Sequence, residues 1–242
     1  MNGWAPYCGI APLPDDWLMR WNFDPWLLAV LALTLAFSGR IPTGSRPAIR
    51  YAAAVFAFLF ISPFCALSSA LFMARVVHHV LLATVLAPLL AAAIPRLGQR
   101  IPLTLTVWTA LQALVFWAWH APPFYEAALS SDAVFWLMQF SVTLSAAIWW
   151  AKLKQAPTAA AVAALLGAMV LMGILGALIT FAGRPLYAPH WLTTQPWGLT
   201  PLQDQQIAGI IMWAPASAIY LLTAMVLLYR WMGRDEAMAA RP

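Results

Sequence analysis

Three of the four histidines in this 242-residue chain lie in two short stretches, each next to a long apolar run. His78 and His79 end the stretch 75–79, and His120 lies in the stretch 119–125. Imidazole is a common metal ligand, and an ionisable side chain beside lipid is costly unless it has a partner or a function. The two stretches therefore indicate a metal site, a cofactor site or a buried polar cluster.

Helical geometry separates the two adjacent histidines. On a helix His78 and His79 point about 100° apart, whereas Arg75 and His79 are four residues apart and share a face. We expect His79 to be a metal or haem ligand, with a hydrogen-bonded tie between helices as the alternative, and His78 to be structural. Arg75 requires an acid, and Asp204 or Glu126 are the candidates, because a buried unpaired charge is costly.

His120 is followed by two prolines, Pro122 and Pro123. Proline disfavours the helical conformation of the residue before it, so the helix should end here and fix the direction of the His120 side chain. We expect His120 to be a second metal or haem ligand. The alternative is that this stretch only ends the helix and places a histidine at the membrane interface.

Four other side chains of ligand type remain. Asp204 opens the last apolar stretch, where its simplest role is to cap that helix, and Met212 follows two turns later. A thioether together with imidazole suits copper(I), although a methionine in a membrane helix is commonly a packing residue. Cys8 can supply a thiolate or pair with Cys65, and His190 lies in the loop before Asp204.

The composition identifies a polytopic membrane protein. Hydrophobic residues make up 63% of the chain and charged residues only 9%, whereas a soluble domain carries about 25% charge. The net charge of +5 does not indicate nucleic-acid binding, because the basic residues lie in short loops between apolar runs. The chain has no P-loop, Gly-rich dinucleotide turn, GxSxG or HExxH motif, which argues against an ATPase or hydrolase, and we expect no enzymatic activity.

Apolar stretches predict an all-α bundle of about seven transmembrane helices. They lie at about 25–40, 50–69, 71–94, 103–121, 133–151, 159–182 and 206–230. Pro88 and Pro215 are expected to kink the third and seventh helices. Residues 1–24 form a separate amino-terminal segment, residues 25–230 the transmembrane domain, and residues 231–242 a tail.

The loops predict the orientation. Ten lysines and arginines fall in one set of loops and tails, and only Arg20 and Arg184 fall in the other. The positive-inside rule then places the amino terminus outside and the carboxyl terminus in the cytoplasm. All four histidines, both cysteines and Asp204 fall on the outer side in this topology.

Three blocks of the chain resemble the CtaG (Caa-type) family of polytopic membrane proteins. They are residues 69–90, which contain Ala-Arg-Val-Val-His-His, residues 119–129, which begin Trp-His-Ala-Pro-Pro-Phe-Tyr, and residues 201–213, which begin Pro-Leu-Gln-Asp-Gln-Gln. Many members of that family have a histidine one turn before the position of His79. Arg75 stands there in this chain, and a cation disfavours a metal ion close by.

The resemblance implies an assembly factor for a haem–copper cytochrome c oxidase in the bacterial inner membrane. It implies copper, expected as copper(I), at an outward-facing site, and an oxidase subunit, foremost the main haem–copper subunit, as partner, with a periplasmic copper donor. The matching site positions are His79, His120, Asp204 and Met212, and Cys8 or His190 are further candidates for the metal. The alternatives are a b-type cytochrome, with His79 and His120 as axial haem ligands, or a metal-free scaffold.

Overall fold

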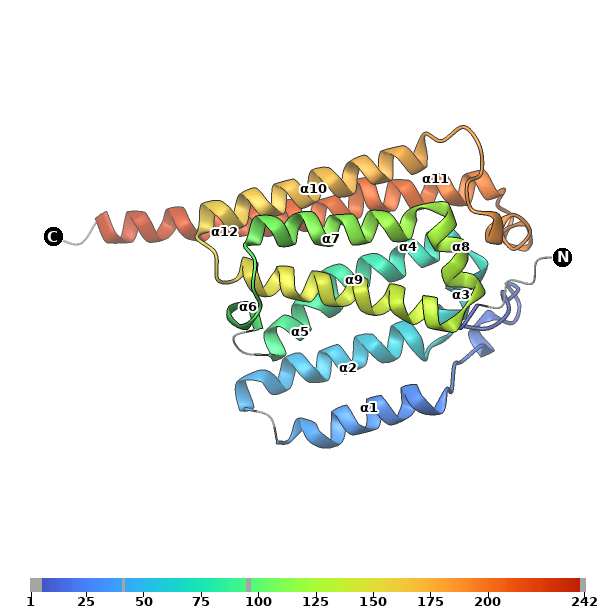
Figure 1. The fold of residues 1–242 in the computed structure, drawn as a ribbon, viewed down its shortest axis with the longest axis horizontal. Coiled ribbons are helices and arrows are strands. Elements are labelled where there is room, and N and C mark those ends of the chain that lie inside the picture. Colours follow the sequence, from blue (N-terminus) through green and yellow to red (C-terminus); the bar gives the residue numbers. More distant parts are fainter. Residues whose placement is uncertain (1–5, 41, 95–96, 240–242) are drawn as a thin grey trace.

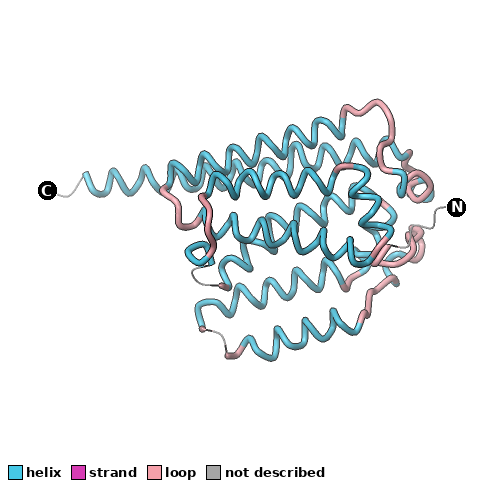
Figure 2. The backbone as a smooth tube through the Cα atoms, viewed as in Figure 1, coloured by secondary structure: helices cyan, strands magenta, loops and turns pink. Residues whose placement is uncertain are grey.

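The structure is a computed structural model that describes residues 6–40, 42–94 and 97–239. It is 79% helical and has no strand among these residues, which confirms the predicted all-α class. The long helices lie side by side along one direction, and the chain ends lie at opposite ends of the bundle (Figures 1 and 2).

Helices occupy each of the seven predicted stretches, and several of these stretches are divided. The helices are α1 (Pro25–Ser38), α2 (Arg46–Phe60), α3 (Pro63–Ala70), α4 (Phe72–Leu81), α5 (Ala87–Ala93), α6 (Leu97–Arg100), α7 (Leu105–His120), α8 (Pro122–Ser130), α9 (Asp132–Leu153), α10 (Thr158–Thr180), α11 (Pro201–Ile211) and α12 (Ser217–Ala239). The predicted tail from residue 231 continues the last helix as far as Ala239.

Four helical segments are long and apolar enough to cross a membrane. They are Phe72–Ala93, Asp132–Leu153, Thr158–Thr180 and Pro201–Gly233. A fifth is present if Thr43–Phe60 and Pro63–Ala70, bent by 46° at their junction, count as one span. The described residues thus form a helical membrane protein with four or five candidate spans. The bent pair and the shorter helices α1 and α7 occupy the other three predicted stretches.

Prolines explain most of the irregular points. Ser62 caps α3, its hydroxyl accepting a hydrogen bond from the Phe64 amide (3.2 Å), and Pro63 takes the first helical position. The predicted single helix over 50–69 is therefore divided. A π-helical turn at Leu82–Leu86 precedes Pro88, and another at Met212–Ala216 contains Pro215. Both predicted kink sites are thus irregular, because proline cannot donate the usual backbone hydrogen bond.

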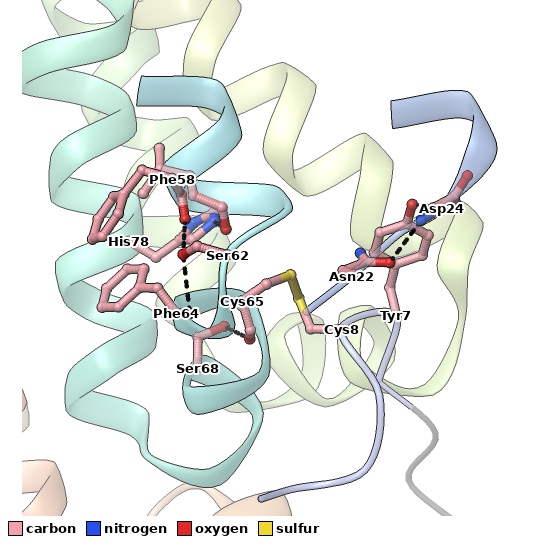
Figure 3. The surroundings of a disulfide bond; sticks show 11 residues. Tyr7, Cys8, Asn22, Asp24, Phe58, Ser62, Phe64, Cys65, Ser68 and His78 are labelled. Carbon is pink, nitrogen blue, oxygen red and sulfur yellow. Dashed lines mark hydrogen bonds between the residues drawn. A yellow bond between two sulfur atoms is a disulfide. The ribbon is translucent and has the colours of Figure 1, made fainter. Parts of the chain in front are cut away.

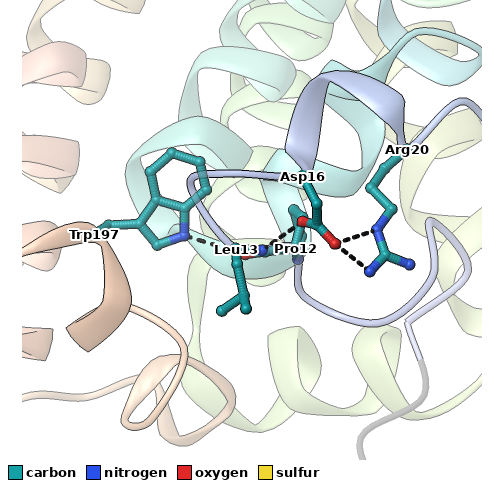
Figure 4. A network of polar contacts seen from close by, with 5 residues as sticks. All are labelled: Pro12, Leu13, Asp16, Arg20 and Trp197. Atoms are coloured by element: carbon teal, nitrogen blue, oxygen red, sulfur yellow. Dashed lines mark hydrogen bonds and ion pairs between the residues drawn. The ribbon is translucent and has the colours of Figure 1, made fainter.

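The amino-terminal segment packs against the loop that precedes α11. The carboxylate of Asp16 pairs with Arg20 and accepts a hydrogen bond from the Leu13 amide (2.9 Å), as Figure 4 shows. The indole of Trp197 donates to the Pro12 carbonyl (3.3 Å) across 185 residues of sequence. Asp24 caps α1 as predicted, accepting from the Trp26 amide at 2.8 Å.

The bundle separates basic loops from the histidine-bearing region. The α9–α10 connection, α6 and the carboxyl end of α12 lie at one end, whereas α3, α8 and the start of α11 lie at the other (Figure 1). Lys152, at the first end, donates to the Ile101 carbonyl at 2.6 Å. This segregation matches the charge pattern of the sequence.

Two glycines allow α10 and α11 to approach closely. A Cβ atom on Gly176 would lie 2.6 Å from the Gly209 carbonyl oxygen and 2.8 Å from the Trp213 amide nitrogen. Backbone cannot move aside as a flexible side chain can, so both helices would have to shift. Small residues at helix crossings are typical of membrane bundles.

We predict that Gly176→Ala lowers the free energy of unfolding by about 2 kcal/mol, because it overpacks this crossing. Gly167→Ala is the matched control on the same helix, since the nearest atom to its Cβ would be 4.0 Å away, on Thr109. Thermal unfolding of both variants in one detergent measures the difference, and equal midpoints would contradict the tight crossing.

Candidate metal-binding site

His79 and His120 meet inside the bundle. His79 lies on α4 and His120 is the last residue of α7, and both are buried. Their ring centroids are 5.2 Å apart with the planes at 88°. The prediction that these two histidines approach one another from different helices is confirmed by this geometry.

The backbone fixes the tautomer of His120. Its Nδ1 lies 2.6 Å from the carbonyl oxygen of Phe116, one turn earlier on α7. A carbonyl can only accept, so Nδ1 carries the proton and Nε2 keeps its lone pair. The Phe116 ring stacks on the imidazole at 4.5 Å and holds its orientation. This is the arrangement typical of a metal-binding histidine, whose second nitrogen donates to a carbonyl or carboxylate.

Both nitrogens of His79 and Nε2 of His120 are buried without a hydrogen-bond partner among the described residues. Buried polar atoms are normally satisfied, and each exception requires an explanation. A neutral imidazole has one lone pair, so the two rings in contact can offer one nitrogen each to a single metal ion.

His78 is engaged differently. Its Nε2 donates to the carbonyl of Leu59 in α2 at 3.2 Å, and its ring packs edge-on against Phe60. Figure 3 shows His78 beside Phe64, with which it stacks. These contacts agree with the expectation that His78 is structural, and its Nδ1 has no hydrogen-bond partner among the described residues.

Cys8 is not available as a thiolate ligand in this structure. Its sulfur is bonded to that of Cys65 on α3, so the expectation that it completes a metal site is wrong for this state (Figure 3). The disulfide anchors the amino-terminal segment to the bundle across 57 residues of sequence. Of the two interpretations of Cys8, a thiolate ligand or a partner of Cys65, the structure shows the disulfide with Cys65.

His190 is also fully hydrogen-bonded. Its Nδ1 donates to the Ala70 carbonyl (3.2 Å), and its Nε2 accepts from the Tyr125 hydroxyl (2.6 Å). The expectation that His190 or Cys8 is a further metal ligand finds no support. Both His190 nitrogens are engaged, and no three His, Cys, Asp or Glu residues in the described parts of the chain form a group that could hold a metal. His190 instead anchors its loop to the end of the bundle.

Acid should release this loop. Burial lowers the pKa of His190 from 6.5 to about 3. Between about pH 3 and pH 6.5, His190 is therefore neutral in the folded loop but protonated once the loop is released. The stability of the folded loop is lost as the pH falls from about 6.5 towards 3. We predict faster amide hydrogen exchange in residues 186–194 at pH 5 than at pH 7.5, after correction for intrinsic rates. His190→Gln should remove most of this pH dependence, and an unchanged dependence would exclude His190 as its cause.

Asp204 caps a helix, but not the predicted one. Its carboxylate accepts from the amides of Phe72 (2.7 Å) and Met73 (3.1 Å) at the start of α4, whereas Thr200 and Gln203 form the capping box of α11. Thr200 precedes Pro201 and so occupies the cap position, which leaves Asp204 one turn inside α11 and free to reach the neighbouring helix. The prediction that Asp204 caps its own helix is therefore wrong.

Arg75 makes no ion pair with a carboxylate of the described residues. All three of its guanidinium nitrogens lack a hydrogen-bond partner there, so the predicted pairing with Asp204 or Glu126 is wrong. The guanidinium is fully buried, and its Cζ lies 5.2 Å from the Phe135 ring centroid. The Tyr125 hydroxyl is an electrostatic neighbour, but no guanidinium nitrogen meets hydrogen-bond geometry with a described residue.

Met212 is buried at the crossing of α10 and α11. Its Cβ would lie 3.1 Å from a Cβ on Gly176, which identifies it as a packing residue of that crossing. The π-helical turn that it begins also contacts α4. A role for its sulfur in a metal site stays a prediction.

Two groups that hydrogen-bond to His120 were not predicted from the sequence. The Phe116 carbonyl sets the His120 tautomer, and the Tyr187 hydroxyl donates to the His120 carbonyl at 2.7 Å. Tyr187 also stacks on Phe72 at 3.7 Å. The sequence signal for Tyr187 is weak, because it is one aromatic residue in a loop rich in aromatic and proline residues.

Residues 26–234 match the family model described as cytochrome c oxidase caa3 assembly factor (Caa3_CtaG). This match covers most of the chain, so the protein belongs to that family of assembly factors, as the three sequence blocks indicated. No curated protein and no solved structure matches the chain.

Proposed function

We propose that this assembly factor binds one copper(I) ion between His79 and His120 and passes it to a cytochrome c oxidase. The observation that carries the proposal is the pair of buried imidazoles, 5.2 Å apart, with three unpartnered nitrogens. The Phe116 carbonyl supports it by leaving the lone pair of His120 on Nε2.

The donor set favours copper(I) over other metals. Structural zinc takes four ligands and catalytic zinc three protein ligands, whereas magnesium and calcium require oxygen ligands. Copper(I) is a soft ion that is stable with two imidazole ligands. Met212 is the candidate for a third, soft ligand. A low coordination number also suits a cargo ion, which must leave the site to reach the oxidase.

A haem between the same residues is the alternative. It would require a flat gap between the rings that extends well beyond them on every side. The stacking of Phe116 on His120 at 4.5 Å, and the stacked pair of Phe72 and Tyr187 nearby, favour a single ion. A metal-free scaffold is the other alternative, but it leaves the unpartnered nitrogens of His79 unexplained.

The proposal includes a bacterial inner-membrane location with seven membrane-crossing helices and the histidine-bearing end outside. The segregation of basic residues to the opposite end supports this orientation. The protein would act without turnover, taking copper from a periplasmic donor and contacting the main haem–copper subunit of the oxidase.

Elemental analysis and a visible spectrum of the purified protein test the proposal together. We expect about one copper per chain after anaerobic incubation with copper(I) and removal of excess metal, in a protein without colour. A Soret band would establish the haem alternative instead. Protein that retains neither copper nor haem would leave the scaffold interpretation.

A further inference from the structure

A second feature of the bundle lies away from the two histidines, between α1, α2, α5 and α9. It is a cavity of about 230 Å³ with an apolar wall. Four aromatic rings contribute to it: Phe56, Phe60, Trp136 and Phe140. Phe60 and Trp136 stack at 5.3 Å, and Trp136 and Phe140 lie 5.4 Å apart.

The cavity is bounded on one side by α1, which lies at the edge of the bundle (Figure 1). This wall is formed by Val30, Leu31 and Thr34, and α1 itself buries only Leu27 and Ser38. A wider cavity of about 570 Å³ shares Val30, Phe56, Trp136 and Phe140 with the first. Because they share these four residues, the two cavities adjoin, and together they are called the cleft between α1 and α9.

One polar side chain in this apolar wall is unexplained. Gln139 on α9 is 1% exposed, and neither its amide nitrogen nor its amide oxygen has a hydrogen-bond partner among the described residues. The nearby hydroxyl of Thr34 is satisfied by the Val30 carbonyl at 2.7 Å. A buried amide without a hydrogen-bond partner destabilises the folded protein, so a partner is expected.

We propose that this cleft binds the head group of a membrane-soluble quinone. The ring would lie among the four aromatic side chains, and the tail would leave between α1 and α9 into the lipid. The Gln139 amide, whose atoms are covered in this structure, would turn into the cavity and donate a hydrogen bond to a ring carbonyl. This site is independent of the copper proposal, since neither His79 nor His120 lines it.

Size and chemistry select this occupant. An apolar cavity of roughly 150 Å³ can stay dry and admit one benzene ring, so 230 Å³ accommodates a single substituted ring. A phospholipid acyl chain would fill the volume but leave Gln139 unsatisfied. A helix from a partner protein is too wide to enter. A neutral ring that bears carbonyl groups satisfies the amide and stacks on the aromatic wall.

Equilibrium binding of a quinone with a ten-carbon tail, to full-length protein in nanodiscs of defined phospholipid, tests the site. Wild type should bind one quinone per chain. Gln139→Leu should raise the dissociation constant about tenfold through loss of the hydrogen bond. Ala53→Leu, which fills the cavity from α2, should abolish binding. Gln112→Leu is the matched control, a buried glutamine on α7 that does not line the cleft, and should bind as wild type does.

Stability separates loss of the site from loss of the fold. Without quinone, Gln139→Leu should melt at a higher temperature than wild type, because it removes an unsatisfied buried amide. Quinone should raise the melting temperature of wild type and Gln112→Leu alike, that of Gln139→Leu by less, and that of Ala53→Leu not at all. The proposal is overturned if wild type binds no quinone or if Gln139→Leu and Ala53→Leu bind it as wild type does. Native mass spectrometry that finds a phospholipid which quinone does not displace would overturn it as well.

Discussion

His120→Ala should lower the affinity for copper(I) at least about 100-fold. Loss of a residue that only orients a metal ligand costs 10- to 100-fold in affinity, so loss of one of two ligands should cost no less. Competition with a chromophoric copper(I) chelator measures the change. In cells, the same variant should reduce the copper content of the oxidase without changing the amount of its main subunit in the membrane.

His78→Ala provides the control for this experiment. His78 is adjacent to His79 and equally buried, but it donates to the Leu59 carbonyl and should affect folding more than copper affinity. If His78→Ala and His120→Ala weaken copper binding equally, the assignment of ligands is wrong. Phe116→Leu, which keeps the carbonyl and removes the stacked ring, should have an intermediate effect.

Asp204→Ala should lower the free energy of unfolding by about 3 kcal/mol. The carboxylate accepts from the buried Phe72 amide and the partly buried Met73 amide at the start of α4, and its removal leaves both unsatisfied at a cost of about 1–3 kcal/mol each. Because Asp204 lies on α11, the variant should also loosen the contact between α11 and α4 that holds the turn carrying His79. Denaturation in detergent and amide exchange of residues 72–79 measure the two effects.

Two variants distinguish this role from a general effect of charge. Asp204→Asn retains one acceptor oxygen and should lose about half as much stability. Gln203→Ala removes part of the exposed capping box of α11 and should cost about 1 kcal/mol. If Asp204→Ala is no more destabilising than Gln203→Ala, Asp204 does not join the two helices.

Local chemistry explains what the sequence could predict. The lengths of the hydrophobic stretches located the helices, and Asp24-Pro25 marked the start of α1. Pro88 and Pro215 marked the two π-helical turns, before α5 and before α12. The approach of His79 and His120 also followed from local arguments, since helix periodicity and the position of Pro122 set their directions. Four of the seven predicted membrane helices meet the length and composition of a span outright.

Tertiary contacts decided the remainder. Asp204 is a reasonable cap for its own helix by sequence, and only the packing of α11 against α4 brings it to the Phe72 amide. Arg75 had two acids at a suitable depth, yet it forms an ion pair with neither, and Asp204 accepts from the start of α4 instead. The roles of His190 and Cys8 depended in the same way on which of several partners the fold supplies.

X-ray absorption spectroscopy of the copper-loaded protein can identify the ligands of the metal. We predict copper(I) with two nitrogen ligands that show the outer-shell scattering of imidazole, and loss of that signal in the His79→Ala variant. A sulfur contribution at full occupancy would identify Met212 as a third ligand and extend the site. Copper bound without imidazole scattering, or an unchanged spectrum in His79→Ala, would contradict the proposed site.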